Sequence, residues 1–166
     1  MQWVERIVRD FRLADKPTLE IGSYDVNGSV RPFFSGPYLG VDLRPGPGVD
    51  FVHDIETAAV TPTHPWTTVV STEMLEHTPR PWLAVANMVQ CLGPRRGGLI
   101  LTTRGFEFPR HDHPADYYRF SLEAIGTMMI DNGGHVLELR EDPACPGVFC
   151  YARFNEPRGY VADEPI

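Results

Sequence analysis

Acidic residues follow four short apolar segments of the sequence, at spacings that suit a nucleoside ligand. Glu20 belongs to a segment that ends at Gly22, and Asp42, Asp54 and Glu73 come at the ends of the next three segments. An acidic side chain roughly twenty residues beyond a glycine turn can accept hydrogen bonds from both hydroxyls of a ribose. This series predicts a ligand that contains a nucleoside, bound where the apolar segments end.

The turn from Leu19 to Gly28 indicates which kind of nucleoside ligand fits. Gly22 would let the backbone approach a ligand closely, and Gly28 would let a following helix pack tightly and offer its free N–H groups to a carboxylate or phosphate. A dinucleotide fingerprint needs glycines where this chain has Tyr24 and Asn27. The carboxylates of the turn would also repel a pyrophosphate, whereas an amino-acid ligand carries an ammonium group. The turn therefore favours a methionine moiety over a dinucleotide.

Aromatic, imidazole and carboxylate side chains are interleaved between residues 104 and 120. His111 and His113 are candidate general bases, because an unperturbed imidazole titrates near pH 6.5. The pattern His111-x-His113-x-x-Asp116 could also hold zinc. Its loop contains proline and no other histidine is spaced to complete it, so we expect no metal site. The side chains that could contact an acceptor, or could simply cover the core, are those of His77, Phe106, Tyr117, Tyr118 and Arg119.

Alternating strands and helices must position these residues. Helical periodicity predicts a helix over residues 2–13, another from Pro81 to the stop signal Gly93-Pro94, and a third from the N-cap Ser121 to Asn132. Strands are expected at residues 18–21, 38–43, 49–53, 67–71, 98–103, 135–140 and 148–154.

This order of elements predicts an α/β fold with a Rossmann-like, seven-stranded sheet. The sheet should be mostly parallel, with helices on both faces, and the terminal hairpin makes the last strand antiparallel. Such sheets bind ligands beyond the carboxyl ends of their strands, where the acidic series lies. We expect a single domain over residues 1–154 and a polar tail over residues 155–166.

Composition disfavours several classes of function. The formal net charge is -7, and no basic run is longer than Arg95-Arg96, so nucleic acid is not an expected partner. No apolar run approaches the roughly 20 residues of a membrane span, and the first residues lack the features of a secretory signal. Cys91, Cys145 and Cys150 form no C-x-x-C pair. We expect a cytoplasmic protein that acts on a small molecule.

Five stretches of the chain, taken in order, resemble the class I S-adenosylmethionine-dependent methyltransferases, in particular the methyltransferase type 11 group. They are Leu19–Gly22 with Gly28, Gly40–Asp42, Val52–Ile55, Val69–His77 and Gly97–Leu101. The resemblance implies S-adenosylmethionine as the cofactor, with its methionine part near Gly22, its ribose at Asp42, and its adenine at Asp54 and Ile55. The full predicted cofactor set is Glu20, Gly22, Ser23, Gly28, Asp42, Leu43, Asp54, Ile55 and Glu73.

The resemblance also bears on the acceptor. The stretch from His113 to Ser121 looks like one in type 11 relatives near glycan or small-metabolite pathways, which implies a sugar-like acceptor. The chain departs from the family at Tyr24, where glycine is commoner, and its segment from Gly28 to Tyr38 is short and implies a stunted first helix. We expect methyl transfer to an oxygen or nitrogen of a small molecule. The alternatives are a non-catalytic methyltransferase-like domain that acts as a regulatory or assembly partner, and a nucleotide-dependent oxidoreductase, which the missing glycines disfavour.

Overall fold

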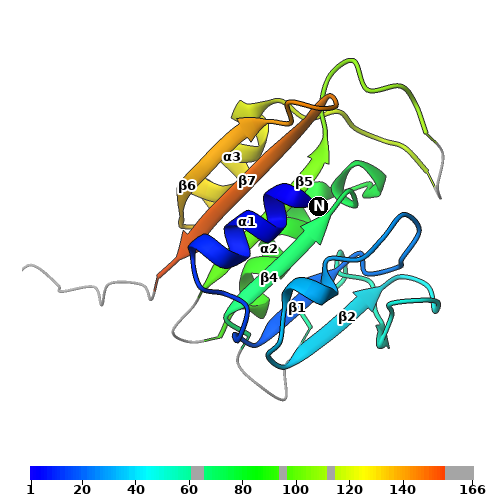
Figure 1. Ribbon diagram of the computed structural model, residues 1–166. Helices are drawn as coiled ribbons and strands as arrows, with labels where there is room; N and C mark the ends of the chain where they lie inside the picture. Colours follow the sequence, from blue (N-terminus) through cyan, green and yellow to red (C-terminus); the bar gives the residue numbers. More distant parts are fainter. Residues whose placement is uncertain (61–65, 94–96, 112–114, 156–166) are drawn as a thin grey trace, which may run out of the picture.

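One sheet carries every strand that the structure describes. The computed structural model describes residues 1–60, 66–93, 97–111 and 115–155. Its seven strands lie in the order β3-β2-β1-β4-β5-β7-β6 (Figure 1). The strands are β1 (Thr18–Ile21), β2 (Tyr38–Asp42), β3 (Phe51–Val52), β4 (Thr68–Thr72), β5 (Gly98–Arg104), β6 (Gly134–Glu141) and β7 (Gly147–Phe154).

The pairing of the strands confirms the predicted fold class. β1 pairs in parallel with β2 and β4, β2 pairs in parallel with β3, and β4 pairs in parallel with β5. β7 is antiparallel to both β5 and β6. The sheet is therefore mostly parallel with an antiparallel last strand, and its strand ends differ from the predicted ranges by at most about two residues.

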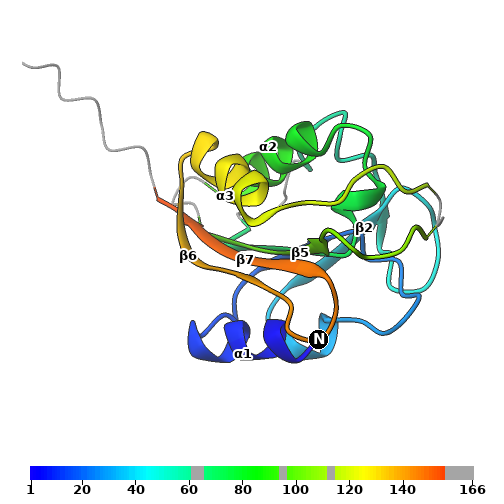
Figure 2. The same cartoon turned by 90° about the horizontal axis from the view of Figure 1, so that it is seen from above.

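Helices cover both faces of the sheet, as predicted (Figure 2). α1 (Gln2–Asp10) lies on one face, and α2 (Pro81–Cys91) and α3 (Leu122–Asp131) lie on the other. α3 begins at the predicted cap, because the Ser121 side chain accepts a hydrogen bond from the Ala124 N–H at 3.2 Å. α1 ends three residues before the predicted residue 13, and Arg12 there adopts a left-handed backbone with φ of 55°.

Apolar side chains alternate between the two faces along the central strands. On β4, Val69 packs under α2 and α3, whereas its neighbour Val70 packs against α1. β7 repeats the pattern, since Cys150 lies on the first side and Tyr151 on the second. The central strands are thus buried on both faces, which explains their continuous apolar sequences.

The connection from β1 to β2 contains no α-helix. Only the 3₁₀ helix η1 (Arg31–Phe33) forms there, which agrees with the expected stunting of the first helix. Pro32 and Pro37 lack an N–H group and so cannot donate helical hydrogen bonds. The expectation that Gly28 leads into a helix with free N–H groups for a ligand is therefore wrong.

The parallel strands end at one edge of the sheet, which brings their following loops together. The predicted cofactor residues lie in the loops after β1, β2, β3 and β4, apart from Glu20 in β1 and Asp42 at the end of β2. The predicted acceptor residues lie in the loop after β5, apart from His77, which follows β4. None of the helices in the described part of the chain is long and apolar enough to cross a membrane. Residues 156–166 of the predicted tail lie outside the described residues.

Candidate functional site

The loop after β1 is held against the end of β2 and the segment that follows it. All backbone N–H groups of residues 22–25 donate hydrogen bonds within the protein. The acceptors are the Val41 carbonyl for Gly22 and Ser23, at 2.9 and 3.1 Å, the Asp42 carboxylate for Tyr24, at 3.2 Å, and the Pro47 carbonyl for Asp25, at 2.9 Å. This loop is therefore shaped by the neighbouring strand, and its amides are already used.

Gly22 occupies a position that no other residue suits. Its φ is +83°, and a Cβ atom built on it would lie 2.7 Å from the Cβ of Met74. Only glycine combines this backbone conformation with so close a contact. Ser23 follows with its side chain buried, and its hydroxyl oxygen has no hydrogen-bond partner among the described residues. An orphaned hydroxyl beside a tight glycine turn is a feature that a bound ligand could satisfy.

The other predicted cofactor residues lie in differing environments at the same edge. Asp42 accepts hydrogen bonds from the backbone N–H groups of Tyr24 and Arg44, each at 3.2 Å. Asp54 accepts one from the N–H of Glu56 at 2.9 Å. The Ile55 side chain is buried in the core, whereas Leu43 is 57% exposed. Gly28 has a φ of +107°, and its N–H donates to Asp25 at 2.8 Å.

Glu20 lies beneath this edge, on the face of the sheet that carries α1. Its side chain is 4% exposed, and it accepts a hydrogen bond from the Tyr38 hydroxyl at 2.7 Å. Burial raises the pKa of Glu20 to about 7, although the bond from Tyr38 opposes this shift. The structure therefore places Glu20 as a support of the first two strands, and direct contact with a cofactor stays a prediction.

Glu73 ends β4 in a strained conformation. Its φ is +53°, a left-handed value that non-glycine residues rarely adopt. Its carboxylate accepts a hydrogen bond from the Thr102 hydroxyl at 2.7 Å and forms an ion pair with Arg104 at 2.5 Å. Strain of this kind often concentrates at functional sites. Glu73 thus joins the edge of the predicted cofactor site to the start of the acceptor loop.

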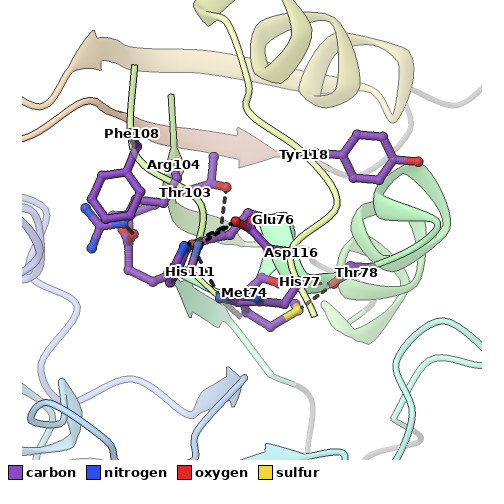
Figure 3. Close-up of polar contacts among 12 residues, drawn as sticks. Met74, Glu76, His77, Thr78, Thr103, Arg104, Phe108, His111, Asp116 and Tyr118 are labelled. Carbon is purple, nitrogen blue, oxygen red and sulfur yellow. Dashed lines mark hydrogen bonds and ion pairs between the residues drawn. The ribbon is translucent and has the colours of Figure 1, made fainter. Parts of the chain in front are cut away.

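Two histidines converge on a buried carboxylate next to Glu73. Glu76 lies in the 3₁₀ helix η2 (Leu75–His77), is fully buried, and accepts a hydrogen bond from the Thr103 hydroxyl at 2.8 Å. Its second oxygen, Oε1, lies 3.9 Å from His77 Nε2 and 4.0 Å from His111 Nε2 (Figure 3). Burial, and then the charge of Glu73, raise the pKa of Glu76. We call Glu76, His77 and His111 the imidazole–carboxylate cluster.

The loop that carries His111 is held by a partly buried ion pair. Asp116 is paired with Arg119 through both carboxylate oxygens, at 2.5 and 2.6 Å. The same arginine donates to the carbonyls of Phe108 and Pro109, at 3.0 and 2.8 Å. The Arg119 guanidinium holds the pKa of Asp116 well below its usual range. Arg119 therefore fixes the loop, and its donors point to the protein.

An open pocket of about 300 Å³ lies beside the cluster, and it brings several predicted acceptor residues together. Asp116 lines this pocket and also approaches His111 Nδ1, at 3.6 Å, so the pocket and the cluster share a wall. Phe106 is 65% exposed and does not line it. His113 lies outside the described residues. The pocket is lined by Phe108, Arg110, Asp116, Tyr117, Tyr118 and Arg119.

Sequence reasoning did not select Glu76, Thr103 or Arg104 as functional residues. The adjacency of Glu76 and His77 in the sequence was a usable signal, because both follow the end of a predicted strand. The approach of His111 was not visible, since it comes from a loop without periodicity about 35 residues later.

Comparisons with known proteins bear on the fold. No protein-family model and no curated protein sequence matches the chain. Solved structures do match it. A methyltransferase from Aquifex aeolicus that depends on S-adenosylmethionine is 15% identical, with a TM-score of 0.68 over 90% of this chain and 88% of that one.

Two further solved structures show the same arrangement. An S-adenosylmethionine-dependent methyltransferase from Mesorhizobium loti is 14% identical, with a TM-score of 0.67 over 89% of this chain and 96% of that chain. Magnesium protoporphyrin IX methyltransferase from Synechocystis PCC 6803, solved with S-adenosylmethionine bound, is 14% identical, with a TM-score of 0.63 over 93% and 77% of the two chains. This chain therefore has the fold of the class I S-adenosylmethionine-dependent methyltransferases.

Proposed function

We propose that this protein transfers the methyl group of S-adenosylmethionine to an oxygen or nitrogen atom of a small molecule. The observation that carries this proposal is the placement of Gly22, Asp42, Asp54 and Glu73 at the carboxyl ends of four neighbouring parallel strands. Ligands of open α/β sheets bind at this edge. The similar structures have this fold, and one of them was solved with S-adenosylmethionine bound.

The residues of the edge suit each part of this cofactor. Gly22 provides the left-handed turn that lets Met74 pack closely against this loop, and the buried hydroxyl of Ser23 lacks a partner among the described residues. Asp42 can accept hydrogen bonds from the ribose hydroxyls in exchange for those it accepts from the two loop amides. We also propose that this protein is a member of the methyltransferase type 11 group.

The acceptor would occupy the pocket beside His111. The cofactor supplies the methyl carbon: the acceptor atom bonds to it, the sulfur–carbon bond breaks with its electron pair left on sulfur, and the acceptor proton passes to a base. His111 is our candidate to take that proton, and burial, and then His77, lower the pKa of its imidazole. A pocket of about 300 Å³ suits a small acceptor, and a sugar-like one is part of the proposal.

Calorimetric titration tests the cofactor part of this proposal. We expect S-adenosylmethionine and S-adenosylhomocysteine to bind and NAD not to bind. Asp42→Ala should weaken binding by at least about tenfold, which corresponds to one or two lost hydrogen bonds to ribose. Asp10→Ala, which removes an acid from the exposed side of α1, is the matched control. Binding of neither methionine nucleoside would overturn the proposal.

One observation favours a second candidate function. The amides of residues 22–25 are already bonded within the protein, and no α-helix follows the loop. A non-catalytic methyltransferase-like domain, acting as a regulatory or assembly partner, would have this property. A folded protein that binds neither S-adenosylmethionine, S-adenosylhomocysteine nor NAD would support this second function.

A further inference from the structure

The imidazole–carboxylate cluster contains a gap that its own members do not close. Glu76 Oε1 is buried and accepts no hydrogen bond from the described residues. The nearest imidazole nitrogens, at 3.9 and 4.0 Å, are too distant for a direct hydrogen bond. A buried carboxylate oxygen without a partner is costly, so the arrangement favours a group between these three atoms.

Two arginines beside the cluster are paired with carboxylates other than Glu76. Arg104 is paired with Glu73, and Arg119 is paired with Asp116. Among the described side chains, the one that donates a hydrogen bond to Glu76 is the neutral hydroxyl of Thr103, which bonds the other carboxylate oxygen. With Glu76 ionised, the three carboxylates and two guanidinium groups around the cluster sum to one negative charge, which would attract a cation.

The other ring nitrogen of His77 is held as in metal centres. His77 Nδ1 hydrogen-bonds the carbonyl of Ala115, whereas His111 Nδ1 lies 3.6 Å from the Asp116 carboxylate and has no hydrogen-bond partner among the described residues. A partner such as the Ala115 carbonyl fixes the ring and leaves the Nε2 lone pair for a metal. Both Nε2 atoms face Glu76 Oε1 (Figure 3). The two imidazoles thus converge on one oxygen from separate segments of the chain.

The separations also suit a shared cation. One ligand atom from each of Glu76, His77 and His111 lies within 4.8 Å of the other two. Two ligands that each lie about 2.1 Å from one metal ion are separated by roughly 3 to 4 Å, so a small contraction closes the site. Two imidazoles and one carboxylate suit zinc, manganese or iron better than magnesium or calcium.

We infer that Glu76, His77 and His111 bind one divalent transition-metal cation. The pattern His111-x-His113-x-x-Asp116 lies within one loop, whereas the ligands inferred here come from both η2 and the loop after β5. The three protein ligands leave coordination positions open, and the His111 side chain is 36% exposed. A bound cation would occupy His111 Nε2, so the base role proposed for His111 applies to the metal-free protein, and in the metal-bound protein the acceptor proton would pass to water.

Metal binding to the purified, metal-free full chain tests the inference without any assay of methyl transfer. Titration with Zn²⁺ or Mn²⁺ alone should give about one bound equivalent. Glu76→Gln and His111→Ala should each weaken binding at least about 100-fold, whereas His135→Ala, which removes an exposed histidine of β6, should change nothing. Binding that is absent, or that survives both substitutions, would overturn the inference.

A measurement on the unaltered protein covers the case in which the variants fail to fold. Co²⁺ bound by two imidazoles and a carboxylate should give visible absorption bands that an equivalent of Zn²⁺ abolishes. Featureless spectra of aqueous Co²⁺ would overturn the inference. Calorimetry with S-adenosylmethionine separates the two proposals: cofactor binding without metal binding overturns only the metal site, and metal binding without cofactor binding overturns only the proposed function.

Discussion

The glycine loop after β1 and the imidazole–carboxylate cluster lie at the same edge of the sheet but are built differently. The loop works through its backbone, with amides bonded to the neighbouring segment and a glycine pressed against Met74. The cluster works through side chains, and it contains buried ionisable groups and an oxygen without a partner among the described residues. Backbone geometry suits shape recognition of a cofactor, whereas clustered side chains suit activation of an acceptor.

In the loop after β1, we expect the largest effect from a substitution at Gly22. Gly22→Ala must place a methyl group 2.7 Å from Met74 in a left-handed backbone. We expect a loss of roughly 2 to 5 kcal/mol in the free energy of unfolding, and loss of cofactor binding. Urea unfolding provides the measurement.

Gly133→Ala is the matched control for this strain. Gly133 has a similar φ of +79°, but nothing lies within 4 Å of a Cβ atom built on it. Gly133→Ala should lower the free energy of unfolding by only about 1 kcal/mol, the cost of the left-handed backbone conformation alone. Equal losses at the two glycines would contradict the tight contact with Met74.

Beneath the loop, Glu20 should make stability depend on pH. The pKa of Glu20 in the folded protein is about 7, against an ordinary value of 4.5, so its contribution is fully present below pH 4.5 and is lost as the pH rises through 7. Glu20→Gln should match the wild type at pH 4.5 and be more stable by about 3 kcal/mol at pH 8.5. Urea unfolding at the two pH values measures the difference.

The matched control is Glu141→Gln, which neutralises an exposed acid at the end of β6. It should change stability by less than about 0.5 kcal/mol at either pH. A Glu20→Gln variant that follows the wild type at both pH values would show that burial does not hold a proton on this carboxyl group.

On the cluster side, Asp116→Asn should loosen the loop that brings His111 to Glu76. It weakens the bidentate pair with Arg119, and we expect a cost of about 2 kcal/mol. Hydrogen exchange at the Tyr117 amide, which donates to the Glu76 carbonyl at 2.8 Å, should accelerate. Asp15→Asn, at an exposed site, is the control. Unchanged hydrogen exchange in Asp116→Asn would show that the Asp116–Arg119 pair does not hold this loop.

The smallest effect is expected at the rim of the acceptor loop. Phe106→Ala removes a side chain that is 65% exposed, so stability should change by less than about 0.5 kcal/mol. Thermal unfolding measures this change, and Phe120→Ala, which empties a buried position in the same loop, should cost about 3 kcal/mol or more. A large loss of stability in Phe106→Ala would show that the Phe106 side chain packs in the core.

Much of the edge could be predicted because its strands carry strong local signals. Buried parallel strands have continuous apolar sequences, and acids mark their ends: Asp42 is the last residue of β2, and Glu73 directly follows β4. The missing helix after Gly28 was signalled by its prolines. The meeting of His111 with Glu76 depends on the Asp116–Arg119 pair and on a loop folding back to β4, which no local pattern encodes.

Amide chemical-shift mapping during titration with S-adenosylhomocysteine tests the central claim most directly. We predict that shifts concentrate at Gly22, Ser23, Asp42 and Asp54, with smaller shifts at Glu73 and none at Gly133, which follows the C-terminal end of α3. No shifts at any residue, or shifts that spare the carboxyl ends of β1 and β2, would contradict a cofactor site at this edge.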